Sequence, residues 1–380
     1  MKTLPRRRFA LLLSAVVALL LWTGDSNGVT AARQGVHITA NGWRTPLYGM
    51  SLVQNASGAL GTSCEQLTAP QVEAARFGRR TSRAMLKSSP HAVVSAGGEG
   101  MKFEIIYSDA AGTGFNDNVH GATRRRALEA AAMAWSKVLK GSITVRIDAV
   151  MEEPSDEDTA EGNILLATAG PVDFWLVNNI GMPSSLAWQL QGRRDDGVEA
   201  DIQVNVNPEI NWEYRADGQA TPDKVSFVYT LIHEIAHGLG FVDSFDPETG
   251  TLLNDPVPFI YDTFINRGND QRRRVLTRPV QEIKGDMISK DLWFGGEHAI
   301  DASKRSIRPL PMIKLYAPNP YEAGSSIAHV DQDTYADFKT GVMTPRDFGN
   351  GNDKIDILTL GILRDLGYQL IPNAQTARVQ

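Results

Sequence analysis

Two histidines and a glutamate stand close together near the middle of the chain, in the segment His233–His237 (HEIAH). Residues four apart on a helix lie on one face, so both imidazoles can offer a nitrogen to one zinc ion. Glu234 follows the first histidine and can reach a water on that metal. Because zinc lowers the pKa of such a water towards neutrality, the carboxylate can take its proton and pass it to a leaving amine. The segment therefore predicts a zinc-dependent hydrolase with Glu234 as general base.

The flanks of this segment predict the helix that must position it. Thr221 can cap the helix and Pro222 suits its first position, and the apolar run 227–239 is typical of a buried helix. Gly240 can adopt the backbone angles that end the helix and turn the chain beneath the metal. We expect a helix from Thr221 to Gly238.

The third metal ligand has two candidates. Asp243 follows the glycine turn by three residues and can offer a carboxylate oxygen, and the spacing favours it. His329 lies just upstream of a second turn, and imidazole is a good zinc ligand. If His329 is not a ligand, it is a candidate to stabilise the oxyanion.

The longer pattern His233-Glu234-x-x-His237-x-x-Gly240-x-x-Asp243 resembles the zinc motif of the metzincins, in the form with aspartate in the third position. The resemblance covers residues 101–370 and implies a zinc metallopeptidase domain at 101–372, with a long insertion at 244–340. It implies an α+β fold: a zincin domain with a twisted mixed sheet, an active-site helix and a C-terminal helix after a methionine turn.

The segment Gly341–Pro345 (GVMTP) resembles that methionine turn, with Met343 beneath the metal, although Thr344 stands where many metzincins have tyrosine. The chain is also similar to a set of exported bacterial peptidase-like proteins that share a segment like Gly324–Asp331. In the metzincins an edge strand pairs with extended peptide substrates, and this implies the same role for residues 202–206.

Other elements follow from periodicity and end signals. Residues 103–107 and 143–149 predict strands, and residues 202–206 predict an edge strand because every second residue is polar. Thr123 can cap a helix over 124–140 that stops at Gly141. Asp356 can cap a helix over 357–366 that Gly367 ends.

The N-terminal hundred residues predict two segments outside the zinc domain. A basic start, an apolar run over 9–22 and small residues before Ala32 are typical of a secretory signal peptide at 1–31. Residues 32–100 are expected to be an N-terminal extension or a pro-segment, with a helix over 69–86 and a cleavable pair at Arg79 and Arg80. Cys64 is either a removable zinc ligand or an inert thiol. A tail over 373–380 ends the chain.

Composition limits the classes of partner that the protein is expected to bind. The 380 residues carry a formal net charge of -6, which argues against a nucleic-acid binder, and a single cysteine excludes an internal disulfide. We expect a secreted monomer, extracellular or periplasmic, that acts on a protein or peptide substrate. No stable membrane insertion is expected after signal removal. The alternative is a secreted binding or surface protein whose zinc site is structural or vestigial.

Overall fold

The computed structural model divides the chain into two units, 1–32 and 33–380, and the described residues all belong to the second. The described stretches are 36–38, 43–46, 48–54, 60–66, 89–153, 164–194, 199–335, 341–347 and 354–372. The expected signal peptide, the helix over 69–86 with its arginine pair, and the tail lie outside these stretches. No described helix combines the length and the apolar character needed to cross a membrane.

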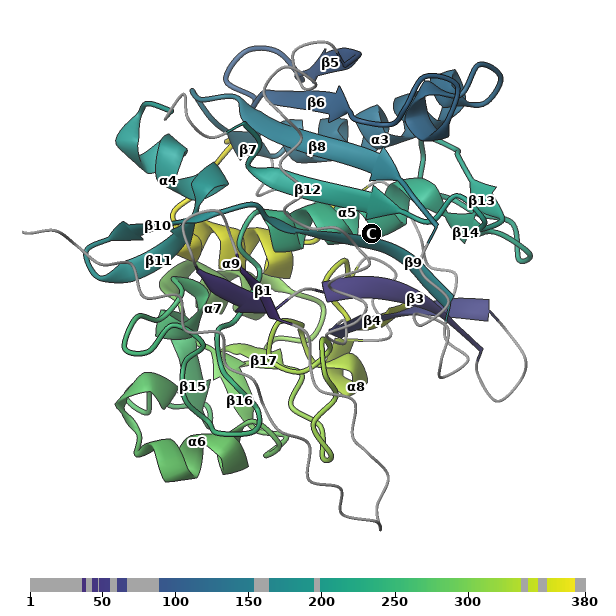
Figure 1. Ribbon diagram of the computed structural model, residues 1–380. Helices are drawn as coiled ribbons and strands as arrows, with labels where there is room; N and C mark the ends of the chain where they lie inside the picture. Colours follow the sequence, from purple (N-terminus) through teal and green to yellow (C-terminus); the bar gives the residue numbers. More distant parts are fainter. Residues whose placement is uncertain are drawn as a thin grey trace, which may run out of the picture. The chain divides into compact units, whose positions relative to one another are not determined.

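An eight-stranded mixed sheet forms the centre of the described unit, in the order β18-β4-β3-β9-β12-β8-β6-β5. Its inner strands β6, β8 and β12 are parallel, β9 runs antiparallel to β12, and β3 runs antiparallel to β9 (Figure 1). The bounds are β3 Tyr48–Gln54, β4 Leu60–Gln66, β5 His91–Val94, β6 Phe103–Tyr107, β8 Val145–Met151, β9 Ile164–Pro171, β12 Ile202–Val206 and β18 Arg346–Asp347.

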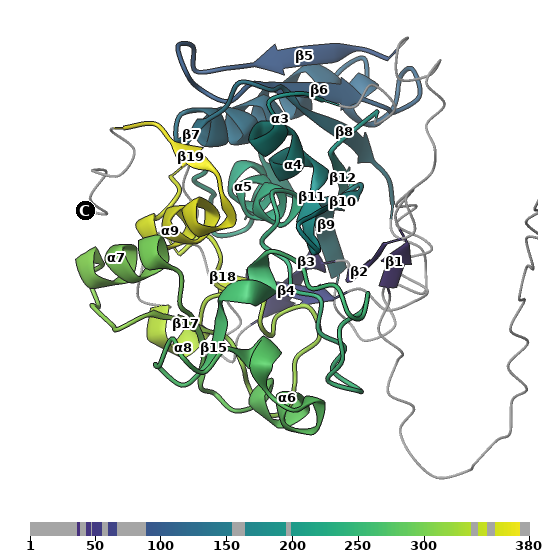
Figure 2. The same ribbon diagram turned by 90° about the vertical axis from the view of Figure 1, so that its left-hand side faces the viewer.

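Two helices, α3 (Gly121–Ser136) and α5 (Phe227–Gly238), pack on one face of this sheet. Figure 2 shows both on the same side of β8, β12 and β9. Every residue of α5 is buried, because the helix lies between the sheet and the rest of the core. The indole of Trp135 on α3 donates to the carbonyl of Ile232 on α5 over 3.1 Å, which fixes the two helices against each other.

A second layer lies beyond α5. Residues 244–340, predicted as an insertion, contain a three-stranded antiparallel sheet of β15 (Ile265–Arg267), β16 (Leu292–Phe294) and β17 (Ile313–Leu315). Helix α7 (Glu297–Arg305) packs closely on α9 (Ile357–Leu366). The remaining helices include α4 Ser184–Gln191, α6 Val280–Asp286 and α8 Gln332–Tyr335.

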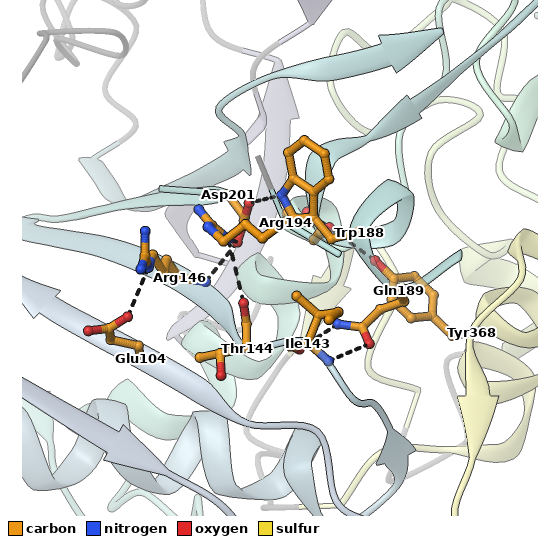
Figure 3. A network of polar contacts seen from close by, with 11 residues as sticks. Glu104, Ile143, Thr144, Arg146, Trp188, Gln189, Arg194, Asp201 and Tyr368 are labelled. Atoms are coloured by element: carbon orange, nitrogen blue, oxygen red, sulfur yellow. Dashed lines mark hydrogen bonds and ion pairs between the residues drawn. The ribbon is translucent and has the colours of Figure 1, made fainter. Parts of the chain in front are cut away.

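A polar network ties α4 to the starts of two central strands (Figure 3). The carboxylate of Asp201, just before β12, accepts from the indole of Trp188 at 2.7 Å and from the amide of Arg146 at 2.8 Å, and it pairs with Arg194. The side-chain oxygen of Gln189 accepts from the amide of Ile143 at 3.2 Å. These contacts fix the start of β12, a strand on whose face α5 packs.

The structure confirms a mixed α+β architecture and corrects several element boundaries. Helix α9 begins after Asp356, whose carboxylate accepts from the amides of Leu358 and Thr359, as predicted. Helix α3 starts at Gly121, before the expected cap Thr123, and ends at Ser136. Residues 139–140 form a strand, β7, that pairs with β19 (Gln369–Leu370), so these residues leave the helix.

Helix α5 is also shorter than expected. It begins at Phe227, because the hydroxyl of Ser226 accepts from the amide of Tyr229 and caps the first turn. Residues Val225–Ser226 form strand β14, which pairs with β13 (Trp212–Glu213), so the predicted start at Thr221 is wrong. The stop is as expected: Gly240 has a φ of 107°, a conformation that favours glycine.

The strand over 202–206 is present but is not an edge. It lies between β8 and β9 in the centre of the sheet. Alternating polarity reports which face of the sheet a side chain points to, and it carries no information on lateral neighbours. On the side away from β12, strand β9 pairs antiparallel with another extended strand, β3.

Candidate metal centre

Three histidines meet in a fully buried cluster beneath the sheet. His233 and His237 come from α5, and His329 comes from the loop that follows β17. Their Nε2 atoms lie 3.2 Å apart for His233 and His237 and 3.2 Å apart for His233 and His329. The four-residue spacing on the helix places His233 and His237 together. His329 lies 96 positions after His233 in the chain, and tertiary folding brings it to them.

Each imidazole is oriented by a backbone carbonyl. The Nδ1 atoms of His233, His237 and His329 lie 2.6, 2.7 and 3.0 Å from the carbonyl oxygens of Val342, Phe241 and Ser325, respectively. A carbonyl can only accept, so each Nδ1 must carry the hydrogen. In the neutral ring the Nε2 atom is then an unprotonated acceptor, and this is the arrangement found for metal-binding histidines.

Burial lowers the pKa of His233 to about 4, although its bond to the carbonyl of Val342 raises that pKa. Burial also lowers the pKa of His237 and of His329 well below the usual value for histidine. The rings are therefore neutral at neutral pH, and the Nε2 lone pair of His233 lies 3.2 Å from the Nε2 atoms of both His237 and His329. Acceptors facing one another cannot form hydrogen bonds, so the cluster can be satisfied by a cation.

Cys64 completes this group from the far side. Its Sγ atom lies 3.6 Å from Nε2 of His237, and the four ligand atoms of Cys64, His233, His237 and His329 all lie within 4.8 Å of one another. Cys64 belongs to β4, in the segment predicted as extension or pro-segment. The structure thus brings the residue to the histidines, which is the arrangement that the removable-ligand interpretation requires.

Glu234 lies beside the cluster and is fully buried. Its Oε1 accepts from the amide of Met50 on β3, and its Oε2 accepts from the amide of Ala169 on β9, both over 3.0 Å. The pairing of β3 with β9 shifts register directly after Met50, the residue whose amide makes this contact. Burial raises the pKa of Glu234 well above its usual value, while the two amide donors act in the opposite direction.

Asp243, the favoured third ligand from spacing, lies outside the four-residue group. Its Oδ2 accepts from the hydroxyl of Tyr48 at 2.8 Å and its Oδ1 accepts from the amide of Phe245 at 3.0 Å. The ring of Tyr48 stacks on the ring of His237 at a centroid distance of 4.8 Å. Asp243 therefore holds a tyrosine against one of the histidines, and His329 occupies the place expected for Asp243.

The predicted methionine turn lies under the same histidines. Met343 is fully buried, and the amide of Thr344 donates to the carbonyl of Gly341 over 3.2 Å, which closes the turn. The turn contacts the cluster through the carbonyl of Val342, which accepts from Nδ1 of His233. Asp356 at the start of α9 holds the turn by accepting from the amide of Val342.

Two features of the site have no short-range signal in the sequence. The amide of Met50 and the hydroxyl of Tyr48 enter the site through strand pairing, and no motif surrounds either residue. The signals that did exist for Cys64 and His329 were their residue types, because cysteine and histidine are the usual zinc ligands.

Together the fold and the site define a mixed α+β protein with a buried three-histidine, one-cysteine cluster and an adjacent glutamate. A family model described as SPBPB7E8-like matches residues 186–268, a span that begins inside α4 and contains β12 and α5. The match thus includes His233, Glu234 and His237 and ends before His329. No curated protein and no solved structure matches the chain.

Proposed function

We propose that the protein is a secreted zinc-dependent endopeptidase in which His233, His237 and His329 hold the metal and Glu234 is the general base. The observation that carries the proposal is the convergence of three histidine Nε2 atoms beside a buried glutamate. His329 replaces Asp243 as the proposed third ligand, because Asp243 binds Tyr48 and Phe245 instead.

The donor spacing supports zinc. Tetrahedral donors at ordinary zinc bond lengths stand about 3.3 Å apart for two nitrogens and about 3.6 Å apart for nitrogen and sulfur. The corresponding distances in the cluster are 3.2 and 3.6 Å. Soft sulfur and imidazole nitrogen together are also the donor types that zinc prefers over magnesium or calcium.

The chemistry assigned to the chain's own residues is acid–base catalysis. Zinc, when bound, supplies Lewis acidity that makes water a better nucleophile near neutral pH. Glu234 accepts a proton at Oε1 or Oε2 and returns it to the leaving amine nitrogen, a role that the pKa-raising effect of burial suits. Each carboxylate oxygen has two lone pairs, so Glu234 can accept this proton while its Oε1 still accepts from the amide of Met50.

An extended polypeptide is the proposed substrate class. The support is that β9, next to Glu234, pairs on its outer side with an extended segment, β3, through an antiparallel ladder. The metzincin likeness also supports this proposal, because in that family extended substrates pair with a strand of the sheet and a methionine turn, here around Met343, lies beneath the metal. Export is part of the proposal and rests on the basic start and the apolar run over 9–22.

A second candidate function has one observation in its favour. Four protein donors, with Cys64 included, describe a closed site, and closed four-ligand sites are usually structural. In that case the protein is a binding or surface protein whose metal only holds β4 against α5.

The test uses Cys64→Ala, because this variant leaves a position for water. The proposal predicts zinc bound by three histidines and cleavage of denatured protein substrates. It also predicts that adding Glu234→Gln lowers the rate by about 10²–10⁴-fold while zinc stays bound. The matched control is Glu129→Gln in the same background, since Glu129 lies on α3 and binds Tyr107. Zinc-loaded Cys64→Ala protein that cleaves nothing supports the structural candidate.

A further inference from the structure

A cavity of about 250 Å³ is present in the described part of the chain, and none of the residues that line it belongs to the candidate metal centre. Its walls come from the last turn of α4, from the paired strands β7 and β19, and from the loop that carries Glu99. Sites for drug-sized ligands measure about 300–1,000 Å³. The cavity therefore fits a smaller molecule, such as a single amino acid.

The walls of the cavity are held in place by the protein itself. A Cβ atom on Gly141 would lie 2.9 Å from Oε1 of Gln189, so glycine at this position lets α4 approach β7 closely. Gly367, on the opposite wall, has a φ of 122°, a conformation that favours glycine. The side chain of Gln189 is fixed at both ends, because Oε1 accepts from the amide of Ile143 at 3.2 Å and Nε2 donates to the carbonyl of Ile143 at 2.6 Å (Figure 3). A wall that is already ordered lowers the entropic cost of binding a ligand.

Two of the described residues that line the cavity are charged, and they face each other. Nζ of Lys140 lies 2.5 Å from Oε1 of Glu99, and the two side chains are 37% and 59% exposed. The backbone keeps the two residues together, because the amide of Gly141 donates to the carbonyl of Glu99 over 3.2 Å. An ion pair that is this exposed contributes little to stability, so a ligand can separate the two side chains at low cost.

This ion pair defines the charges that a ligand must carry. A ligand with one charge would leave either Lys140 or Glu99 without a partner, whereas a zwitterion pairs with both. An α-amino acid carries its ammonium and its carboxylate on the same carbon atom, so its two charges are close together, like those of the pair. Leu190 adds an apolar wall, because its side chain is 49% exposed where it lines the cavity. An apolar ligand side chain would cover this surface and remove it from water.

We propose that this cavity binds an apolar amino acid, with the ligand's carboxylate on Lys140, its ammonium on Glu99 and its side chain on Leu190. The inference goes beyond the proposed function and does not rest on it, because the cavity and the metal centre are built from different residues.

The test measures the binding of L-leucine to the full-length protein by isothermal titration calorimetry. Leucinamide, which lacks the carboxylate, and N-acetylleucine, which lacks the ammonium, are titrated for comparison. The variants are Lys140→Gln, Glu99→Gln and Leu190→Ser, and their side chains are exposed enough for the changes to leave the core intact. Lys137→Gln is the matched control, because Lys137 is an exposed lysine three positions before Lys140 and does not line the cavity.

Wild-type and Lys137→Gln protein are expected to bind one leucine per chain with a dissociation constant of about 1 mM or below. Lys140→Gln and Glu99→Gln should each weaken binding at least about tenfold, because each removes a charge-assisted hydrogen bond. Blocking either end of leucine should weaken binding to the wild type by a similar factor, for the same reason. Leu190→Ser should weaken leucine binding about three- to tenfold, because less apolar surface is then buried.

Three results overturn the inference. The first is the absence of saturable leucine binding up to about 10 mM, ten times the expected constant. The second is equal leucine affinity in Lys140→Gln and Lys137→Gln protein, which would place the ligand elsewhere, including on the metal. The third is equal affinity for leucine and its two blocked forms, which would show that the cavity does not recognise a zwitterion. By contrast, protein that binds leucine as expected and cleaves no peptide supports the inference and contradicts only the peptidase proposal.

Discussion

Helix α5 and the β3–β4 hairpin both reach the candidate metal centre, and they do so by different means. Helix α5 carries His233, Glu234 and His237 within one turn and a half, so helical geometry alone sets their relative positions. The β3–β4 hairpin (Tyr48–Gln54 and Leu60–Gln66) brings Cys64 next to His237 across 173 positions of sequence, and strand pairing with Met50 and a hydrogen bond from the Ser325 hydroxyl hold it there. One region is preorganised by local structure and the other depends on long-range contacts.

A buried helix cannot move its histidines without exposing its apolar faces, whereas the position of Cys64 depends on the ladders that join β4 and β3 to β18 and β9. The Nδ1 partners of the histidines follow the same division, because all three lie outside the hairpin. The comparison can be tested by paired variants, each with a matched control.

The largest effect is expected from His329→Ala. Because this change removes a donor from the cluster, we expect zinc affinity to fall by more than about 100-fold, beyond the 10–100-fold typical for groups that only orient a ligand. Asp243→Asn is the control and should lower the affinity by less than about tenfold. Competition with a chromophoric chelator measures both. The reverse order of effects would restore Asp243 as the third ligand.

Glu234→Gln should destabilise the resting protein by up to about 3 kcal/mol. Both carboxylate oxygens accept from backbone amides, so the new NH₂ group must face a donor and leave it unsatisfied. Glu129→Gln is the control, because its oxygen can still accept from Tyr107 and little should change. Urea unfolding followed by far-ultraviolet circular dichroism measures the free energy of unfolding. Equal effects in the two variants would contradict the double contact at Glu234.

Gly49→Ala should loosen the hairpin by about 1–3 kcal/mol. A Cβ atom there would lie 2.7 Å from Cγ2 of Thr168 and 3.0 Å from the carbonyl oxygen of Ala167, so β3 would have to move away from β9. Gly238→Ala is the counterpart on α5, where the Cβ atom would lie 2.4 Å from Cγ2 of Ile202. We expect faster hydrogen exchange confined to the hairpin and β9 for Gly49→Ala, and a loss of global stability for Gly238→Ala. A global loss from both variants would show that the hairpin does not detach separately.

The smallest effect is expected from two tyrosine hydroxyls. Tyr48→Phe removes a donor from the buried carboxyl of Asp243 and should cost about 1–2 kcal/mol. Tyr229→Phe on α5 removes a 3.2 Å bond to the carbonyl of Gly341 and should cost about 0.5–1 kcal/mol. Thermal unfolding of the two proteins measures the difference. A smaller cost at Tyr48 than at Tyr229 would show that Asp243 does not hold the hairpin.

How well the sequence predicts an element depends on how far apart in the chain the interacting residues lie. The cap and the stop of α9 are correct to the residue, because Asp356 and Gly367 act on backbone groups within three positions of themselves. The start of α5 was misplaced, because Thr221 and Pro222 are good helix signals and the pairing of Val225–Ser226 with Trp212–Glu213 overrides them. Residues 202–206 form the predicted strand with two neighbours that alternation does not reveal.

The sequence by itself determined that His233 and His237 share a helix face with Glu234 next to the first of them, because a fixed rise and turn per residue relate them. It also limited the candidates for the other metal ligands to a few residue types. Only the tertiary structure decided that His329 joins the cluster while Asp243 binds Tyr48, and that Cys64 closes it through the hairpin. The physical reason is that loop closure over a hundred residues is set by the sum of core contacts and strand ladders, and no short pattern of residues encodes that sum.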